Sequence, residues 1–433
     1  MKLWQKDNTE TSSMVESFTV GRDKEFDALL APFDVQGNKA QAAMLAKIGI
    51  ISAEENDALQ HELDNILKEV TVPGFALPDH VEDIHSYIEL LLTERVGDAG
   101  KKIHTGRSRN DQVAVDIKLF LRAEILKIKE EVKNTFNLFI GKADEHKSKL
   151  MPGYTHLQLA MPSSAGLWLG AYAESLVDDL EMLSAAFNIV NKNPLGSGAG
   201  FGSSFPLDRM DTTQRLEFAA MNVSSVYAQM TRGKAEKAVA TGISYVAATL
   251  GRFAYDCCLY LNQNFGFLSF PASLTTGSSI MPHKKNPDVF ELIRAKCNRI
   301  QSTPNELTLL INNLPSGYHR DMQLTKEVLF PALEELKACL QMTCLMLEHI
   351  NIHDGILNDE KYKYLFTVEA MNHLVQQGMS YRDAYREIGN QVERNEFSFD
   401  IERGLKTSHI GSIQNPGFQI ISGYMEMVLK KFE

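Results

Sequence analysis

The 433-residue sequence predicts an all-α protein built around a bundle of long helices. Apolar residues recur every three or four positions through five segments, which are residues 111–150, 163–192, 224–265, 287–311 and 326–350. Alternation of β-branched and polar residues is scarce, so any strands should be short. Helices that are apolar around much of their circumference are difficult to bury within one chain. We therefore expect other subunits to complete the core of the bundle.

Shorter helices are expected before the bundle. The first is predicted over residues 38–50, and Ser52 with Glu55 forms a capping box for the second. A third, over residues 81–96, begins with the polar turn at 82–85 and ends near a glycine pair.

The helical patterns shorten after residue 351, with 360–378 and 381–396 the clearest. We therefore place a domain boundary there. The predicted domains are an N-terminal, mostly helical domain (1–104), a central long-helix bundle (105–350) and a small C-terminal helical domain (351–433).

The composition of the chain argues against several classes of protein. The net charge of −11 argues against general nucleic-acid binding, so the charge for an anionic substrate must be local, as at Arg107 with Arg109 and at Lys284 with Lys285. The first residues contain no apolar signal-peptide core, and no uninterrupted apolar run is long enough to span a membrane. Five cysteines without a C-x-x-C pair suggest neither disulfides nor a zinc site, which fits the reducing cytoplasm.

A glycine-rich segment at residues 194–206, PLGSGAGFGSSFP, superficially resembles a nucleotide-binding loop. Its glycine spacing does not fit G-x-G-x-x-G, no strand is predicted before it, and no G-K-[ST] occurs. We interpret it as a loop between helices that lies near the site.

The segment 276–294, TGSSIMPHKKNPDVFELIR, is the strongest candidate for chemistry. Its small residues could close over a ligand, and Asn286 followed by Pro287 predicts an N-cap and a first helical residue. The free amides of that helix start, beside Lys284 and Lys285, would form an anion site. The same residues also fit a polar loop that simply caps a helix.

The string GSSIMPHKKNPDVFE resembles, position for position, the GSSxMPxKxNxxxxE signature of the fumarase/aspartase superfamily. Those enzymes eliminate fumarate from a substituted succinate. The resemblance implies that Ser278 is the catalytic serine, with Ser279 as the alternative, and that Glu291 is the signature glutamate. A serine is a poor base unless it is deprotonated, and nearby amides, Lys284 and the helix start could stabilise its alkoxide.

A second segment, GYTHLQLAMP at 153–162, contains Thr155 and His156. A single histidine at such a place is more often structural. The segment is similar to one in the superfamily whose histidine pairs with the signature glutamate. That resemblance implies a pair of His156 with Glu291, with the histidine as general acid and Thr155 in substrate binding.

The segment HTGRSRNDQV at 104–113 places Ser108, Arg109 and Asn110 directly before a long helix, where side chains and helix amides could bind a carboxylate together. An N-cap with exposed arginines is the simpler interpretation of any one residue. The decapeptide resembles the hallmark of the argininosuccinate lyases, which is more specific than the superfamily signature.

The run at 318–326 is similar to a segment that holds the arginine end of the substrate in argininosuccinate lyases. Tyr318, Gln323 and Lys326 match it, whereas three positions depart from it: His319, Leu324 and Thr325. The E-D-I-H turn at 82–85 also resembles that family and is expected to support the site. A further departure is Gly21, where the family often has a substrate-contacting serine.

The resemblance implies a fumarase/aspartase-like fold of three domains, a homotetramer whose active sites are shared between subunits, and no metal or organic cofactor. The implied reaction is reversible elimination of fumarate from argininosuccinate, which leaves arginine and serves arginine biosynthesis. Lys284, Asn286, Ser108, Arg109 and Asn110 would hold the carboxylates. Alternatives are a sister lyase acting on adenylosuccinate or another N-succinyl compound, and an inactive, crystallin-like structural homologue.

Overall fold

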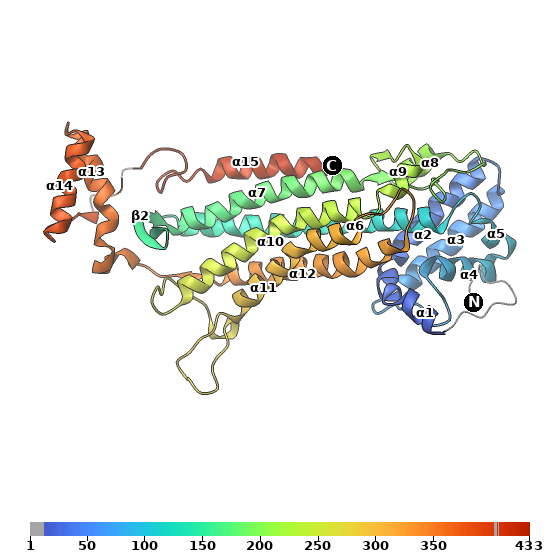
Figure 1. Ribbon diagram of the computed structural model, residues 1–433, viewed down its shortest axis with the longest axis horizontal. Coiled ribbons are helices and arrows are strands. Elements are labelled where there is room, and N and C mark those ends of the chain that lie inside the picture. The colour runs from blue at the N-terminus through green and yellow to red at the C-terminus, as the bar shows by residue number, and fades with distance from the viewer. Residues whose placement is uncertain (1–12, 402–404, 406) are drawn as a thin grey trace. The chain divides into compact units, whose positions relative to one another are not determined.

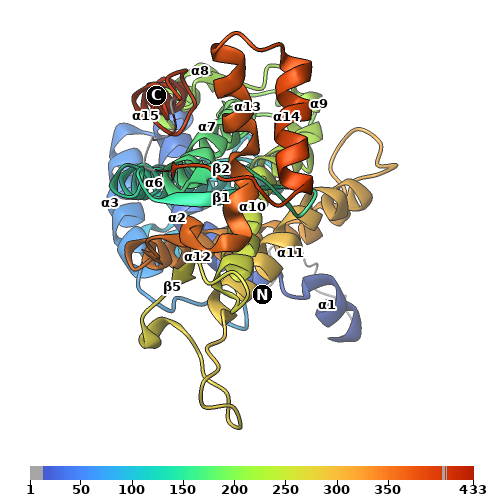
Figure 2. The same ribbon diagram turned by 90° about the vertical axis from the view of Figure 1, so that its left-hand side faces the viewer.

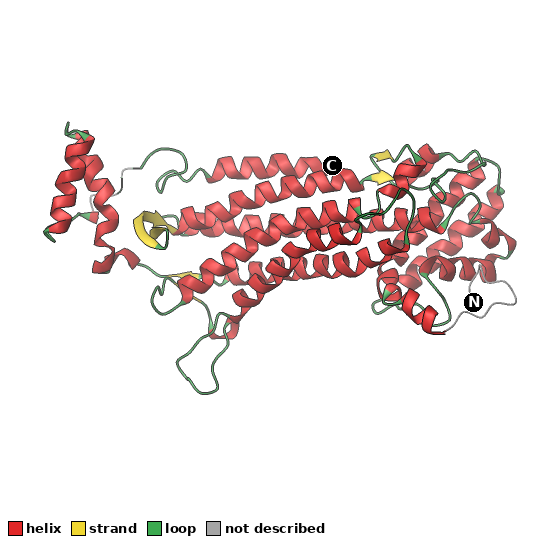
Figure 3. Ribbon diagram, viewed as in Figure 1, coloured by secondary structure: helices red, strands yellow, loops and turns green. Residues whose placement is uncertain are grey.

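The computed structural model describes residues 13–401, 405 and 407–433, and it consists mainly of helices (Figures 1 and 3). This confirms the all-α prediction. The long helices are α6 (Arg109–Glu145), α7 (Ala165–Val190), α10 (Lys234–Leu261), α11 (Asp288–Leu310) and α12 (Leu324–Glu348). Within the described ranges, every helix is too short or too polar to cross a membrane.

The chain forms two compact units. The first comprises the described parts of Met1–Ile128, Met182–Tyr245 and Arg299–Leu336, and the second comprises Lys129–Glu181, Val246–Asn298 and Lys337–Glu433. The unit boundaries fall inside long helices, so each of these helices contributes residues to both units. The division into three domains at residues 104 and 350 stays a prediction.

The core of the first unit lies among α2 (Asp23–Lys47), α3 (Ala53–Val70), α4 (Ile84–Val96) and α5 (Asp98–Lys102). Leucines at positions 45, 59 and 63 are completely buried there. The predicted capping box is present at the start of α3, since Glu55 N–H donates to Ser52 Oγ over 3.2 Å and Ser52 N–H donates to Glu55 Oε2 over 2.9 Å. The remaining helices of this unit are α1 (Ser13–Val20), α8 (Arg209–Arg215) and α9 (Ser225–Met230).

Aromatic side chains hold the long helices of the second unit together. The ring of Phe253 on α10 lies 4.9 Å from that of Phe139 on α6 and 5.7 Å from that of Trp168 on α7. The Trp168 indole also donates to Asp256 over 3.0 Å. Towards the C-terminus, α13 (Thr367–Gln376) and α14 (Tyr381–Glu393) form a helical hairpin (Figure 2), and α15 (Phe418–Leu429) follows.

Strands are short, as predicted, and they pair only two at a time in the described chain. The longest pair is the antiparallel hairpin of β1 (Leu150–Thr155) and β2 (Gln158–Ser164). The others are β3 (Lys192–Asn193) parallel to β4 (Ala220–Met221), and β5 (Leu268–Ser269) antiparallel to β6 (Asn351–Ile352).

Three helix boundaries differ from the prediction. Helix α2 begins at Asp23 rather than at 38 because buried residues such as Phe26 and Leu30 stabilise it despite Pro32 in its interior. The segment 224–265 breaks into α9 and α10 at Gly233, whose φ of 75° no helix accommodates. The segment 360–378 begins as a 3₁₀ helix, η4 (Glu360–Phe366), before α13.

Candidate active site

The sequence-predicted residues fall into two groups, one in each unit. The first group consists of Ser108, Arg109, Asn110, Tyr318, Gln323 and Lys326. The second consists of Thr155, His156, Ser278, Lys284, Asn286 and Glu291.

A cavity of about 290 Å³ in the first unit brings five members of the first group together. Its lining includes Arg109, Asn110, Tyr318, Gln323 and Lys326, although these residues come from segments about 200 positions apart. Charges of both signs line the cavity, because it also contains acidic residues of α2 and of the turn before α4. Such a lining suits a ligand that carries both carboxylate and cationic groups.

Lys326 lies at the buried side of this cavity, with 3% of its side chain exposed. Its Nζ lies 2.6 Å from Oδ1 of Asp23 and 2.6 Å from Oδ1 of Asp27. Burial alone would lower the pKa of Lys326, but the two carboxylates outweigh it and raise the pKa above its ordinary value. The lysine is therefore a fixed positive charge with two anionic partners.

Arg109, the first residue of α6, is held by the N-cap of α4. Its Nη1 donates to Oδ2 of Asp83 over 2.7 Å, and its Nη2 donates to Ser86 Oγ over 2.5 Å. Asp83 also accepts from the Ser86 backbone N–H over 2.7 Å. Burial opposes the charged form of Asp83, but His85 and Arg109 outweigh it and hold its pKa below the ordinary value. Asp83, in the polar turn at 82–85, thus holds the Arg109 side chain in place.

Gln323 contacts the segment where the family's serine was expected. Its Nε2 donates to the carbonyl oxygens of Thr19 over 3.0 Å and Val20 over 3.2 Å, directly before Gly21. Sequence reasoning missed Asp23 and Asp27 as cavity residues. Their spacing of four on a helix was the available signal, but that part of α2 was not predicted to be helical.

A buried cluster of Asp34, His85 and Asp116 lies close to this cavity, which His85 lines. In the described residues these three form the one group of histidine, cysteine and acidic side chains whose ligand atoms all lie within 4.8 Å, so they could hold a metal ion. His85 Nδ1 lies 2.7 Å from Asp34 Oδ1 and 3.5 Å from Asp116 Oδ2.

The charges around this cluster favour a paired network over a metal centre. Half-buried Arg107 donates to Asn38 Oδ1 over 2.7 Å, and Asn38 donates to Asp34 Oδ2 over 2.7 Å. Burial and the neighbouring Asp34 raise the pKa of Asp116 well above its ordinary value. The imidazole of His85, whose pKa Asp34 raises against the opposing effect of burial, and the guanidinium of Arg107 are the cationic partners of the two carboxyl groups.

In the second unit, His156 lies at the tip of the β1–β2 hairpin. Thr155 pairs with Gln158, so His156 and Leu157 form a two-residue turn with φ of 55° and 59°. Such turns usually contain glycine or asparagine, because other residues are strained at positive φ. His156 is exposed there, together with Thr155 and Leu157.

The loop that carries Ser278 is tied at its base. Thr276 and Asn286 form an antiparallel bridge in which the Asn286 N–H donates to the Thr276 carbonyl over 2.8 Å, and the Thr276 hydroxyl bonds to Asp288. Within the loop, Ser278 Oγ accepts from the N–H groups of Ile280, over 3.4 Å, and Met281, over 3.2 Å. Two amides therefore already face this oxygen, as stabilisation of an alkoxide requires.

One local prediction is wrong at this loop. Asn286 does not cap α11, because its side-chain amide donates to the Gly277 carbonyl over 3.3 Å and to Thr276 Oγ1 over 3.5 Å. The first helical bond instead runs from the Glu291 N–H to the Pro287 carbonyl over 3.0 Å. Helix α11 therefore begins one residue later than predicted, with Pro287 rather than Asn286 at the N-cap position.

The predicted His156–Glu291 pair is not formed within the described part of this chain. No hydrogen bond or ion pair joins the two side chains there, and both are exposed, as is Lys284. Their proposed roles require another copy of the chain or a bound substrate.

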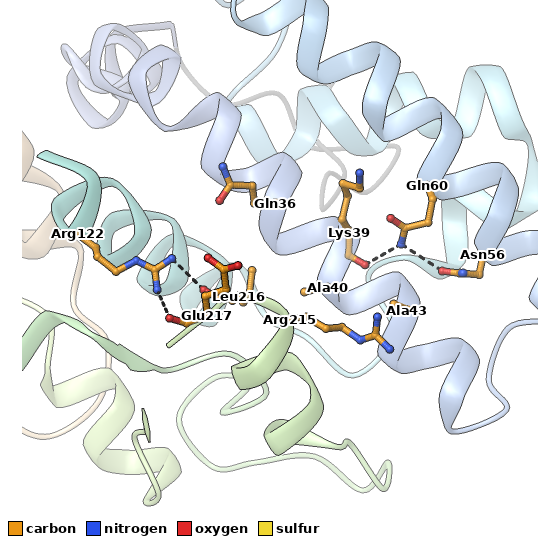
Figure 4. A pocket seen from close by; sticks show the side chains of 10 residues that line it. All are labelled: Gln36, Lys39, Ala40, Ala43, Asn56, Gln60, Arg122, Arg215, Leu216 and Glu217. Atoms are coloured by element: carbon orange, nitrogen blue, oxygen red, sulfur yellow. Dashed lines mark hydrogen bonds between the residues drawn. The ribbon is translucent and has the colours of Figure 1, made fainter. Parts of the chain in front are cut away.

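A second cavity in the first unit, of about 520 Å³, contains none of the predicted residues (Figure 4). Its Arg122 donates to the carbonyl oxygens of Leu216 and Glu217, each over 2.9 Å, and its Gln60 donates to the Lys39 carbonyl over 2.8 Å. These polar groups serve internal contacts, so we assign the cavity no role.

The fold and the two residue groups define a lyase, and comparison with known proteins agrees. The model of a family described as "Lyase" matches residues 7–302, so the chain belongs to that family. The chain is also 51% identical over 431 residues to the argininosuccinate lyase of Phocaeicola vulgatus, covering 100% of this chain and 96% of that protein. It is 38% identical over 384 residues to that of Xanthomonas campestris, covering 89% of each. Within the lyases, the chain belongs to the argininosuccinate lyases.

Solved structures support the fold. An EDDS lyase in complex with formate superposes with a TM-score of 0.76 at 21% identity and covers 98% of this chain and 91% of its own. The 3-carboxy-cis,cis-muconate lactonizing enzyme of Pseudomonas putida gives a TM-score of 0.69 at 16% identity, with 98% and 97% covered. At such identities the likeness shows a shared architecture.

Proposed function

We propose that this protein eliminates fumarate from argininosuccinate and leaves arginine. The observation that carries the proposal is the cavity of the first unit, where the two segments that resemble argininosuccinate lyases lie together. Its mixed charges suit a substrate with carboxylates on its succinyl part and a cationic guanidinium on its arginine part. Full-length similarity to curated argininosuccinate lyases supports the same substrate.

The proposed mechanism is an anti elimination. Ser278 Oγ removes a proton from the succinyl carbon beside a carboxylate, and the N–H groups of Ile280 and Met281 with Lys284 stabilise the negative charge. The carbon–nitrogen bond then breaks as the carbon–carbon double bond forms. His156, supported by Glu291, donates a proton to the departing guanidino nitrogen.

Substrate binding is assigned mainly to the residues of the first unit. Ser108, Arg109, Asn110 and, from the catalytic loop, Asn286 hold the carboxylates, whereas Tyr318, Gln323 and Lys326 hold the arginine end. Thr155 contributes from the hairpin. The proposal needs no metal or organic cofactor, because proton transfer and charge stabilisation are supplied by side chains and amides.

The active enzyme is proposed to be a cytoplasmic homotetramer whose sites combine residues of several subunits. Large apolar side chains are exposed on two of the long helices, including Tyr245 and Tyr255 on α10 and Leu292 and Leu309 on α11. Burial of such side chains between subunits would stabilise an assembly. It would also allow His156 and Glu291 of different copies to meet.

The direct test is release of fumarate, followed by its ultraviolet absorbance, from argininosuccinate, adenylosuccinate and other N-succinyl compounds. Argininosuccinate should react with a kcat/KM at least about 100-fold above the others. Preference for another substrate would make the protein a sister lyase. No activity on any of them would support a structural, crystallin-like role.

A further inference from the structure

Asp111 links two segments that the proposed mechanism treats separately. Its side chain is completely buried in the first turn of α6. Oδ1 accepts from the Ser108 N–H over 2.8 Å, and Oδ2 accepts from the N–H groups of Gly196 over 3.0 Å and Gly198 over 2.9 Å. One carboxylate thus joins the turn that carries Ser108, Arg109 and Asn110 to the glycine-rich loop at 194–206.

The loop end of this link is stiff. Gly196 and Gly198 have φ of 83° and 59°, and a Cβ on Gly198 would lie 2.8 Å from the Gly202 carbonyl oxygen. The Gly202 N–H donates to the Ser197 carbonyl over 3.0 Å, which closes the loop on itself. From the other side, Gln229 donates to Ser197 Oγ over 3.2 Å and to the Gly198 carbonyl over 3.3 Å.

Apart from the bond to Asp111, few hydrogen bonds hold the backbone of residues 108–110. Asn110 N–H donates to Ser108 Oγ over 3.3 Å, and beyond that bond the turn relies on the start of α6. We propose that Asp111 is a positioning residue that sets the Ser108–Asn110 turn against the rigid loop, so that substrate binding and the order of residues 196–198 are coupled. The inference rests on the proposed function of that turn. The glycine-rich loop would then hold the turn at 108–110 in position and would not itself bind a ligand.

The test compares Asp111→Asn with Gln229→Met. The asparagine side chain keeps the size of the aspartate and one acceptor oxygen but presents an N–H group to at least one backbone donor. KM for argininosuccinate should rise about tenfold in D111N while kcat stays within about threefold, since a charge-assisted bond that orders the binding turn is lost. Q229M loosens the same loop without touching the turn, so the coupling predicts that its KM also rises, by a smaller factor of about threefold.

Hydrogen exchange provides a readout that needs no Asp111 variant. In Ser278→Ala enzyme, which should bind argininosuccinate without consuming it, the ligand should slow exchange at the Gly196 and Gly198 amides as well as at 108–110. If the ligand did not change the exchange rates of the two glycine amides, the proposal would be overturned. A wild-type KM in folded D111N, or a wild-type KM in folded Q229M, would overturn it as well. Failure of the wild-type protein to release fumarate would instead overturn the proposed function.

Discussion

Arg109 donates from Nη1 to Oδ2 of Asp83 over 2.7 Å, and this bond joins the first residue of α6 to the N-cap of α4. The carboxylate therefore has two tasks, one in capping a helix and one in aiming a guanidinium into the cavity. Substitution can separate them.

Asp83→Asn should still cap α4 but should hold the Arg109 guanidinium less firmly. Asparagine caps helices about as well as aspartate, so the melting temperature should change little. KM for argininosuccinate should rise about tenfold because the charge-assisted bond to Arg109 is weakened. Asp83→Ala, as a control, should show the same KM and lose about 1 kcal/mol of stability as well. A wild-type KM for Asp83→Asn would show that Asp83 does not position Arg109 for substrate binding.

His156→Asn should leave the β1–β2 hairpin folded but remove the proposed general acid. Asparagine tolerates the left-handed conformation that residue 156 adopts, so folding should be unaffected. Turnover should fall about 10²- to 10⁴-fold, as is typical for loss of a general acid. Leu157→Asn is the matched control at the adjacent turn position, where kcat should be unchanged and the melting temperature slightly higher. Equal loss of turnover in both variants would show that the hairpin, not the imidazole, matters.

Lys326→Met should destabilise the first unit strongly. Removal of the ammonium leaves Asp23 and Asp27 as buried carboxylates without their shared partner, at a cost of about 3–5 kcal/mol. Urea unfolding measures the loss. The double variant with Asp27→Asn should recover part of that stability, because one uncompensated charge disappears. Additive losses in the double variant would show that these groups do not interact.

Asp179→Asn should change how stability depends on pH. Burial on α7 raises the pKa of Asp179 to about 7, and its Oδ2 has no hydrogen-bond partner. Between the unfolded value of 3.8 and about 7 the folded state binds the extra proton, so wild-type stability falls as pH rises through this window. The asparagine variant lacks this loss. Its melting temperature should match wild type near pH 4 and exceed it near pH 8, and equal differences at both pH values would contradict the assignment.

The sequence predicted the helical bundle well because long apolar periodicity survives any tertiary context. It failed where tertiary contacts decide. The helix predicted over residues 38–50 begins at Asp23 because buried residues extend it, and α11 begins one residue later than the predicted N-cap at Asn286. Conversely, the capping box of Ser52 and Glu55 is local, and it formed as predicted.

For the candidate site, too, the sequence predicted some residues and missed others that tertiary packing brings in. Motif resemblance identified Arg109, Asn110 and Lys326, which the fold brings to one cavity, but it gave no indication of Asp23 and Asp27. Those two carboxylates lie on α2 without any motif, and only the packing of α2 brings them to Lys326. His156 and Glu291, which motif resemblance pairs, are both exposed, and no contact within the described chain joins them.

We propose that the Ser278 loop of one copy and the Asn110 cavity of another form one active site. Ser278→Ala should lower turnover by at least about 100-fold, and Asn110→Leu should lower it comparably by weakening substrate binding. The most direct measurement is fumarate release after the two inactive variants are unfolded and refolded together. Mixed tetramers, verified by native mass spectrometry, should regain activity at least about tenfold above either parent, because some sites combine two intact halves. Mixed tetramers with no more activity than their parents would contradict it.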